Sequence, residues 1–316
     1  MGEAKNNLLI LSTDAEEYLK IIRRHNLSDI LIYASKDAAG ADDLCRHCNI
    51  IFGDPDLIEP LLHRATALRW IQSSWAGVEP LLGAHNRSDY LLTGVKGVFG
   101  PIMTEYVLCH MLVHTKKVLQ RYESQKIRQW NDMRPGTLRG QTMGIMGVGS
   151  IGARIAEAAK HFGMITSGYT RKASGCKAID SYFHGDQITD FVAPLDFLVC
   201  VLPDTPSTNH MISNSIFEAM KKSAILINVG RGNSIDETSL EKALWDGEIA
   251  GAVLDVFKEE PLPPEHPLWR APNITITSHT AGPTFPEDVA PVFINNYLKF
   301  IARKPLDHLI DFQRQY

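Results

Sequence analysis

Cysteine is scarce in this chain. The 316 residues contain five cysteines, too few and too scattered for a disulfide framework. Cys45 and Cys48 have the CxxC spacing of a metal or redox site, but no second cysteine pair or matching histidine pair follows. A thioredoxin-like motif would come just after a first strand, whereas this one precedes the apolar run Ile50–Phe52. We therefore expect two ordinary thiols at a helix-to-strand junction, and no metal site.

An excess of positive charge is also missing. The chain has 32 basic and 36 acidic residues, a formal net charge of −4, and no basic block. Proteins dedicated to nucleic acids or anionic membranes usually concentrate lysine and arginine in one region. The composition therefore argues against nucleic acid as a partner.

Long hydrophobic runs are absent near the start of the chain. The longest apolar stretch there is Leu8–Leu11, which is too short for the core of a signal peptide or for a membrane span. We expect a soluble, cytoplasmic protein with no membrane partner.

Short apolar runs alternate with helix-like segments, a pattern typical of βαβ units and parallel sheets. Hydrophobic residues make up 44% of the sequence, and the length corresponds to about two domains. The expected strands are residues 8–11, 30–33, 50–52, 70–72 and 90–92, then 142–146, 164–169, 197–202, 224–229, 252–255 and 274–277. The fold class is therefore α/β with doubly wound parallel sheets, and the six later strands suffice for a dinucleotide-binding fold.

The alternation of short apolar runs and helix-like segments is interrupted at Gly100-Pro101. Residues 102–122 then run without glycine or proline, which predicts one helix of about five turns. The last expected helix, residues 289–302, has no strand after it, so we expect it to pack on the first lobe. We place a dinucleotide-binding domain at residues 100–283 and a substrate-binding domain at residues 1–99 with 284–316.

A glycine-rich turn, Gly147-Val148-Gly149-Ser150-Ile151-Gly152, directly follows an apolar strand and precedes a periodic helix. In a dinucleotide-binding turn the first glycine permits the tight bend, and the second lets the backbone approach a pyrophosphate. The third permits close packing of helix on strand. The alternative is a strand–turn–helix that merely favours glycine.

The second strand of this half ends at Thr170-Arg171-Lys172. A protein that binds NAD would usually place an acid near here to bind the ribose hydroxyls. A hydroxyl followed by two cations suits a 2′-phosphate instead, so we favour NADP, with NAD possible. The alternative is a basic turn exposed to solvent.

Chemistry is expected where the strands end, since ligands of open parallel sheets bind outside the carboxyl ends of the strands. The residues at those ends are Gly147, Thr170, Pro203, Asp204, Thr205, Gly230, Arg231, Asp255 and His279. Glu260 follows in a proline-rich loop that is stiff enough to hold a carboxylate in place. A cation, an acid and a histidine are thus expected at one edge.

The glycine-rich turn, Asn228–Gly232, Leu254–Pro263 and Ser278–Gly282 together resemble the D-isomer-specific 2-hydroxyacid dehydrogenase family. Their order and spacing fit that family over nearly the whole chain. Pro267-Leu268-Trp269 and the Thr170–Lys172 turn are most similar to its glyoxylate/hydroxypyruvate reductase branch. The resemblance implies a Rossmann-type cofactor domain and a flavodoxin-like substrate domain. It also implies the reduction of a small 2-keto acid to the D-2-hydroxy acid by hydride transfer from NAD(P)H.

The resemblance implies that Arg231, Glu260 and His279 form the catalytic set, and their chemistry agrees. His279 can donate a proton to the keto oxygen near neutral pH, while Glu260 holds its ring and favours the imidazolium. Arg231 offers a planar fork to the substrate carboxylate and keto oxygen. Taken singly, a histidine or arginine is more often a surface or capping residue.

Binding residues are implied by the same resemblance. The substrate carboxylate would bind the loop Trp75-Ala76-Gly77-Val78 through the N–H groups of Gly77 and Val78 and a helix N-terminus. Whether Trp75 narrows the pocket or fills the core stays open. Besides the two turns already described, the cofactor would contact Leu202, Pro203, Asp204, Thr205, Val229, Gly230, Asp255 and Ala281, with Asp255 at the nicotinamide carboxamide. The proline that the family often has before the catalytic histidine is Ser278 here.

A homodimer through the helix 102–122 and the polar arm to Gly140 is implied as well. The apolar residues of that helix cover more than one of its faces: Ile102, Met103, Tyr106, Val107, Met111, Leu112 and Val118.

Two alternative functions would fit part of the sequence. Some members of the family act as corepressors, so a nucleotide-sensing scaffold with little turnover is the alternative, although the intact catalytic set argues against it. A methyltransferase with a similar glycine loop would not explain Arg231, Glu260 and His279 together.

Overall fold

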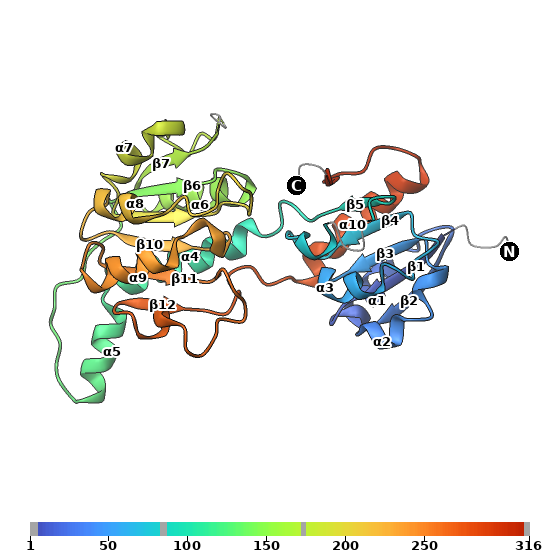
Figure 1. Cartoon of the computed structure of the whole chain (residues 1–316), viewed down its shortest axis with the longest axis horizontal. Coiled ribbons are helices and arrows are strands. Elements are labelled where there is room, and N and C mark those ends of the chain that lie inside the picture. Colours follow the sequence, from blue (N-terminus) through green and yellow to red (C-terminus); the bar gives the residue numbers. More distant parts are fainter. Residues whose placement is uncertain (1–5, 83–86, 172–174, 313–316) are drawn as a thin grey trace. The chain divides into compact units, whose positions relative to one another are not determined.

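The computed structural model describes residues 6–82, 87–171 and 175–312. The chain divides into two compact units, one formed by Met1–Val98 with Thr284–Tyr316 and the other by Phe99–Pro283 (Figure 1). Each unit has its own parallel sheet with helices on both faces, so the predicted doubly wound α/β fold class is confirmed.

Five parallel strands form the sheet of the first unit, in the flavodoxin-like order β2-β1-β3-β4-β5. The strands are β1 Asn6–Leu11, β2 Ile30–Ser35, β3 Ile50–Gly53, β4 Trp70–Ser73 and β5 Leu91–Thr93. The helices are α1 Ala15–Arg24, α2 Ala38–Ala41, α3 Pro55–Ile58 and α10 Pro286–Ile301, with short 3-10 turns η1 Cys45–His47, η2 Glu59–Leu61 and η3 Glu79–Leu81.

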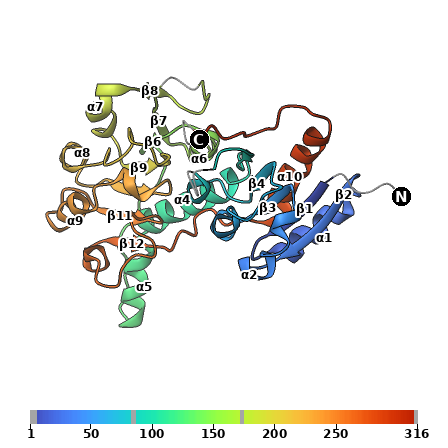
Figure 2. The ribbon, with the colours of Figure 1, turned by 45° about the vertical axis from the view of Figure 1, so that its right-hand side comes forward.

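Helix α10 packs on this sheet although it comes almost three hundred residues after β1 in the sequence (Figures 1 and 2). Its Phe293 is fully buried and stacks on Phe52 of β3 and Trp70 of β4, with ring centroids 4.8 and 5.5 Å apart. Tyr18 of α1 meets the edge of the same Phe52 ring, so α1 and α10 cover one face of the sheet. The opposite face, which carries Ile51, packs against α3 and the segment around η1.

Cys45 and Cys48 lie at the junction between η1 and β3, and both thiols are fully buried. Burial raises the pKa of Cys48 to about 12, so its thiol is a poor nucleophile and a poor metal ligand. Within the part of the chain that the structure describes, no group of three or more histidine, cysteine or acidic side chains is placed to hold a metal ion.

Seven parallel strands form the sheet of the second unit, in the order β12-β11-β10-β9-β6-β7-β8. Six of them, β6 to β11, have the Rossmann order 3-2-1-4-5-6, and β12 extends the sheet beyond β11. The strands are β6 Thr142–Met146, β7 Ile165–Tyr169, β8 Ser181–Phe183, β9 Phe197–Cys200, β10 Ile225–Asn228, β11 Gly251–Leu254 and β12 Ile274–Ile276. The helices are α4 Gly100–Thr115, α5 Val118–Lys126, α6 Ser150–His161, α7 Ile188–Val192, α8 Asn214–Ala219 and α9 Glu237–Trp245, with 3-10 turns η5 Gly185–Gln187, η6 Gly232–Ser234 and η7 Pro267–Arg270.

Strand β8 is a seventh strand that the sequence pattern did not predict. It has only three residues and lies at the edge of the sheet, where its side chains are half-buried or exposed. Strands of this length at an edge carry too few buried residues to give an apolar run. By contrast, β9 and β10 are buried along their whole length, and their continuous apolar runs were predicted within two residues.

The prediction of a single helix over residues 102–122 is wrong. It is two helices, α4 and α5, because Lys117 between them has the left-handed φ of +55°. The carbonyl of Thr115 accepts a hydrogen bond from the N–H of Gly136, 2.9 Å away, instead of continuing the helix. The ammonium of Lys116 donates to the carbonyl of the same Gly136. The break thus depends on a segment twenty residues further along the chain, which helical periodicity does not contain.

No helix within the described ranges combines the length and the apolar character needed to cross a membrane.

The stack around Phe293 gives a stability prediction for the first unit. Phe293→Ala leaves a cavity between Phe52 and Trp70, so it should lower the free energy of unfolding by about 3–5 kcal/mol. Leu298→Ala on the same helix removes a side chain of a residue that is 50% exposed, and should cost less than about 1 kcal/mol. Urea unfolding followed by circular dichroism measures both. Equal effects of the two substitutions would contradict this account of the packing.

Candidate active site

The glycine-rich turn follows β6, at the point where the strand order of the second sheet reverses. Gly147 has a φ of +94°, and a Cβ there would lie 2.7 Å from the Val201 carbonyl oxygen. Gly152 sits inside the first turn of α6, where a Cβ would lie 2.2 Å from the carbonyl oxygen of Gly147. Gly149 differs from both, because its φ is −89° and nothing lies within 4 Å of a Cβ built on it. The fold therefore requires Gly147 and Gly152, and leaves the space beside Gly149 open.

Backbone donors surround that open space. The N–H groups of Val148, Gly149 and Ser150 have no acceptor among the described residues, and they lie at the N-terminus of the twelve-residue helix α6. Unpaired N–H groups and the positive end of a helix dipole together favour an anion. The turn fits the pyrophosphate of a dinucleotide.

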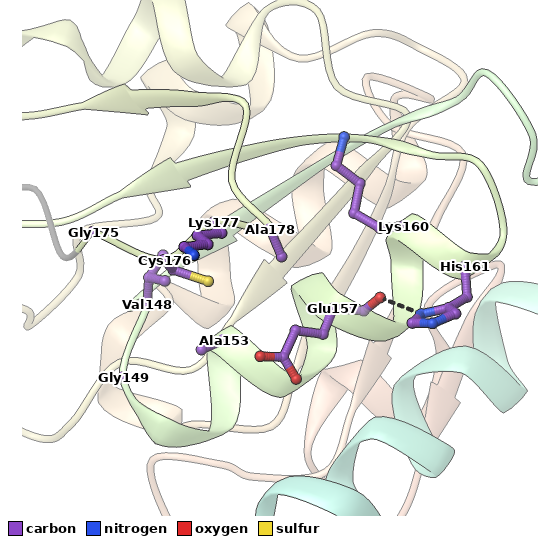
Figure 3. Close-up of a pocket in the computed structure, with 10 residues that line it drawn as sticks. All are labelled: Val148, Gly149, Ala153, Glu157, Lys160, His161, Gly175, Cys176, Lys177 and Ala178. Carbon is purple, nitrogen blue, oxygen red and sulfur yellow. Dashed lines mark hydrogen bonds between the residues drawn. The ribbon is translucent and has the colours of Figure 1, made fainter.

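A groove of about 690 Å³ lies beside this turn on the α6 side (Figure 3). Val148 and Gly149 line one part of it, and Lys160 and His161 of α6 line another, with residues 175–178. Nδ1 of His161 lies 2.8 Å from the carbonyl oxygen of Glu157. The groove leaves the glycine-rich turn accessible from this side.

The turn after β7 carries the residues expected to choose the cofactor. The N–H of Thr170 donates to the carbonyl of Phe183, 3.1 Å away, and Nδ1 of His184 lies 2.7 Å from the carbonyl oxygen of Thr170. Arg171 follows and is exposed. Lys172 lies outside the described residues, so its role stays a prediction.

Arg231 follows β10, and its backbone is held by buried polar groups. The side-chain amide of Asn228 donates to the Arg231 carbonyl at 3.1 Å, and the Ser234 hydroxyl donates to the same oxygen at 2.7 Å. Asn228 is fully buried, and its amide oxygen accepts from the N–H of Gly230. The guanidinium of Arg231 donates to the Gly230 carbonyl at 2.9 Å. These hydrogen bonds fix the backbone position from which the Arg231 side chain extends.

Gly232 brings this turn against the loop that carries Glu260. A Cβ at Gly232 would lie 1.9 Å from the carbonyl carbon of Phe257, so no other residue fits there. The N–H of Phe257 donates to Oε1 of Glu260 at 2.8 Å, and Nδ1 of His279 lies 2.7 Å from Oε2 of the same carboxylate. The structure therefore brings the expected carboxylate and imidazole into direct contact.

Asp255 holds the loop that carries His279. Its carboxylate is 1% exposed and accepts four hydrogen bonds: from the Thr277 hydroxyl, from the N–H and hydroxyl of Thr280, and from the N–H of Ala281. Its backbone carbonyl accepts from the N–H of His279 at 2.8 Å. His279 itself has a left-handed φ of +54°, which is unfavourable for residues other than glycine. The hydrogen bonds to Asp255 stabilise that conformation.

The pKa values of the pair move in opposite directions. The hydrogen bond to Glu260 raises the pKa of His279, and this outweighs burial and the charge of Arg231, which lower it. Burial by itself raises the pKa of Glu260, but the bonds from His279 and Phe257 and the charges of His279 and Arg231 outweigh it and the pKa is lowered. The pair thus favours imidazolium and carboxylate. The charge of Arg231 lowers the pKa of both partners.

The loop expected to bind a substrate carboxylate belongs to the first unit. It follows β4, where the Ser73 hydroxyl donates to the Trp75 carbonyl and accepts from the Trp75 N–H, both at 2.9 Å. The N–H groups of Ala76, Gly77 and Val78 have no acceptor among the described residues. The helix expected after them is only the three-residue turn η3. The indole of Trp75 is half-buried.

The remaining expected cofactor residues lie in the loops after β9, β10 and β12: Leu202, Pro203, Asp204, Thr205, Val229 and Ala281. Leu202, Val229 and Ala281 are buried, and the Asp204 carboxylate accepts from the Asn233 side chain at 2.8 Å. Their contacts with a cofactor stay predictions.

The residues that hold the backbone of Arg231 and the loop of His279 in place were not predicted from the sequence. Asn228 and Thr277 were given no role, although each ends or follows a parallel strand and carries a polar side chain. The carboxylate of Asp255 also accepts hydrogen bonds from the loop of His279, a role that the sequence did not indicate; its expected contact with the nicotinamide stays a prediction. The signal in the sequence was a polar residue at the end of an apolar strand, because such a residue is buried and needs hydrogen-bond partners nearby.

Comparison with known proteins agrees with the geometry. Residues 108–281 match the family model described as "D-isomer specific 2-hydroxyacid dehydrogenase, NAD binding domain". The chain belongs to the D-isomer specific 2-hydroxyacid dehydrogenase family. This match covers more than half of the chain, and the resemblance seen in the sequence is confirmed.

Three relatives show how far the likeness extends. Glyoxylate/hydroxypyruvate reductase A of Photorhabdus laumondii is 33% identical over 254 residues, which are 78% of this chain and 80% of that protein. The crystal structure of a family member from Aeromonas salmonicida is 42% identical, with a TM-score of 0.95 over 98% of this chain and 99% of the other. The NADPH-dependent glyoxylate/hydroxypyruvate reductase of Sinorhizobium meliloti, solved with NADP and sulfate, is 26% identical, with a TM-score of 0.85 over 99% and 100% of the two chains.

The three glycines of the turn should respond differently to alanine. Gly152→Ala forces a Cβ onto the Gly147 carbonyl, so it should destabilise the second unit by about 1–3 kcal/mol or more. Gly149→Ala enters open space at an extended φ, and should change the free energy of unfolding by less than about 1 kcal/mol. Thermal and urea unfolding measure both. A strongly destabilised Gly149→Ala would show that this glycine serves the fold.

Proposed function

We propose that this protein reduces a small 2-keto acid, of the glyoxylate or hydroxypyruvate kind, to the D-2-hydroxy acid with NADPH as the hydride donor. The observation that carries the proposal is the contact between His279 and Glu260 beside Arg231, at the strand edge that also carries the glycine-rich turn. The glyoxylate/hydroxypyruvate reductases among the relatives support this substrate class.

We assign the dinucleotide to the unit Phe99–Pro283 and the substrate carboxylate to the unit Met1–Val98 with Thr284–Tyr316. The glycine-rich turn fits the pyrophosphate, because its unpaired N–H groups surround an open space. The unpaired N–H groups of Ala76, Gly77 and Val78 suit a carboxylate in the same way. The bound dinucleotide supplies the hydride.

In this mechanism His279 donates a proton to the keto oxygen as the carbonyl carbon becomes tetrahedral. Glu260 keeps the imidazole charged and fixes its orientation through Nδ1, which leaves Nε2 as the donor. Arg231 binds the carboxylate and polarises the carbonyl with two parallel donors, a geometry that a lysine ammonium cannot provide. In the reverse direction neutral His279 accepts the proton of the hydroxy acid.

NADP is proposed over NAD because of the turn Thr170-Arg171-Lys172, which offers a hydroxyl and two cations where an NAD-binding protein would place an acid. The S. meliloti reductase, solved with NADP, supports this choice. An arginine–phosphate contact contributes about 1.5–3 kcal/mol, or roughly ten- to a hundredfold in affinity.

The direct test uses purified protein with glyoxylate, hydroxypyruvate, pyruvate and phenylpyruvate, each with NADPH and NADH. We expect turnover of glyoxylate or hydroxypyruvate, with kcat/KM for NADPH about ten- to a hundredfold above that for NADH. Gly149→Ala should fold normally and bind NADPH more weakly, because its Cβ enters the space meant for the pyrophosphate. Binding of NADPH without turnover of any keto acid would favour the corepressor-like scaffold. Equal use of NADH would contradict the assignment of the turn.

The pKa shifts give a pH prediction. The rate of reduction depends on imidazolium, so it should fall as the pH rises through the raised pKa of His279. Glu260→Gln removes the carboxylate that raises this pKa, so the fall should move to lower pH, while oxidation of the hydroxy acid should then begin at lower pH. Glu259→Gln removes a neighbouring negative charge without touching His279, and serves as the control. A pH profile that is the same in Glu260→Gln and wild type would contradict the role of Glu260.

We also propose a homodimer formed through α4, α5 and the arm to Gly140. Large apolar side chains are exposed there: Val118, Leu119, Tyr122, Ile127, Trp130 and Met133. Trp130 is 92% exposed, which is unusual for an isolated chain in water and favours burial against a second copy. Sedimentation velocity tests this proposal, and a monomer at micromolar concentration would contradict it.

A further inference from the structure

Two side chains that the proposed chemistry does not use are linked to Asp255. Tyr106 lies on α4, and its hydroxyl oxygen is 2.6 Å from Oγ1 of Thr277, which follows β12. Thr277 in turn donates to Oδ1 of Asp255. A helix and two strand ends, which lie far apart in sequence, are thus joined by one chain of hydrogen bonds.

The direction of these bonds follows from the groups involved. A carboxylate can only accept, so the single hydroxyl proton of Thr277 points to Asp255. The Tyr106 hydroxyl must therefore donate to Thr277. Burial raises the pKa of Tyr106 to about 12, so its proton is retained across the physiological range. The Tyr106 ring is also packed on His110, with centroids 4.4 Å apart, which fixes the hydroxyl in place.

The other side of Asp255 faces the loop of His279. The carboxylate accepts from the N–H groups of Thr280 and Ala281, both at 2.8 Å, and the backbone carbonyl accepts from the N–H of His279. A rotation of the carboxylate would break bonds on both sides of the left-handed His279. The orientation of Asp255 therefore sets the backbone from which the imidazole projects toward Glu260.

We propose that Tyr106 and Thr277 are positioning residues for the reaction, because their hydrogen-bond chain fixes Asp255 and, through it, the loop that presents His279. This inference rests on the proposed role of His279 as proton donor. It predicts a loss of kcat that exceeds the loss of cofactor affinity, since the three hydroxyl and carboxylate groups lie outside the glycine-rich turn and only Asp255 is an expected cofactor contact.

Three substitutions test this chain of hydrogen bonds. Tyr106→Phe removes one hydroxyl and keeps the ring on His110, and we expect kcat to fall about fivefold. Thr277→Val removes the donor to Asp255 and should lower kcat about tenfold or more, whereas Thr277→Ser keeps the hydroxyl and should restore most of the rate. KM for the keto acid should stay within about twofold of wild type in all three, and Kd for NADPH should change less than kcat.

Tyr297→Phe is the matched control. It removes a buried tyrosine hydroxyl that donates to the Ser28 carbonyl at 2.7 Å in the other unit, and it has no link to Asp255. It should lower thermal stability and leave kcat unchanged. A fall in kcat equal to that of Tyr106→Phe would show that the loss reflects stability alone and would overturn the proposal.

A double variant shows whether Tyr106 and Thr277 act as one connected set of hydrogen bonds or as separate contacts. If Tyr106 acts only through Thr277, the double variant Tyr106→Phe/Thr277→Val should be no slower than Thr277→Val alone. If the losses of kcat in the two single variants multiply in the double variant, Tyr106 does not act through Thr277 and the proposal is overturned.

Hydrogen exchange of the Thr280 and Ala281 amides gives a readout that needs no turnover, and we expect faster exchange in Tyr106→Phe and Thr277→Val. Wild-type protein without reductase activity would defeat the proposed function only, while unchanged exchange and kcat in Tyr106→Phe would defeat this inference only.

Discussion

Asp255 directly follows strand β11, its carboxylate is almost fully buried, and the groups around it fix the backbone of His279. Consecutive N–H groups of His279, Thr280 and Ala281 donate to its carbonyl and carboxylate oxygens. A buried carboxylate without such donors would be strongly destabilising, so the loop and the carboxylate stabilise each other. His279 has a left-handed conformation, which costs roughly 1–2 kcal/mol in a residue other than glycine. The hydrogen bonds between its loop and Asp255 offset this cost.

Close backbone contacts then bring the other members of the site to the same edge. The absence of a side chain at Gly232 lets the Arg231 turn approach the Phe257 segment, and Phe257 donates to the Glu260 carboxylate. Glu260 is thus oriented by a backbone N–H on one oxygen and by His279 on the other. The charge of Arg231 lowers the pKa of both groups, so it favours a charged carboxylate and limits how far the pKa of His279 rises. Proton donation near neutral pH needs this balance.

Local patterns in the sequence predicted the fold class and the glycine-rich turn, because apolar strand runs and glycine spacing depend on adjacent residues, whereas the roles of Arg231, Glu260 and His279 came from the family resemblance. Gly147 and Gly152 could be assigned from spacing alone, and the structure supplies the reason in the absence of room for a Cβ. Features that depend on distant partners were not visible. The break at Lys117 depends on Gly136, and the bond of Tyr106 joins it to a residue 171 positions away. Resemblance placed Asp255 at the nicotinamide, and its hydrogen bonds to the His279 loop are a second role that only the structure shows.

The measurement that tests the central claim most directly separates cofactor binding from proton transfer in His279→Ala. NADPH affinity is obtained by fluorescence titration, and reduction of the best keto acid is followed in a single turnover with enzyme in excess. The account predicts a Kd for NADPH within about twofold of wild type and a reduction rate lower by about 10²–10⁴-fold, the range for loss of a general acid. Reduction by His279→Ala at close to the wild-type rate would contradict it and remove His279 from the chemistry.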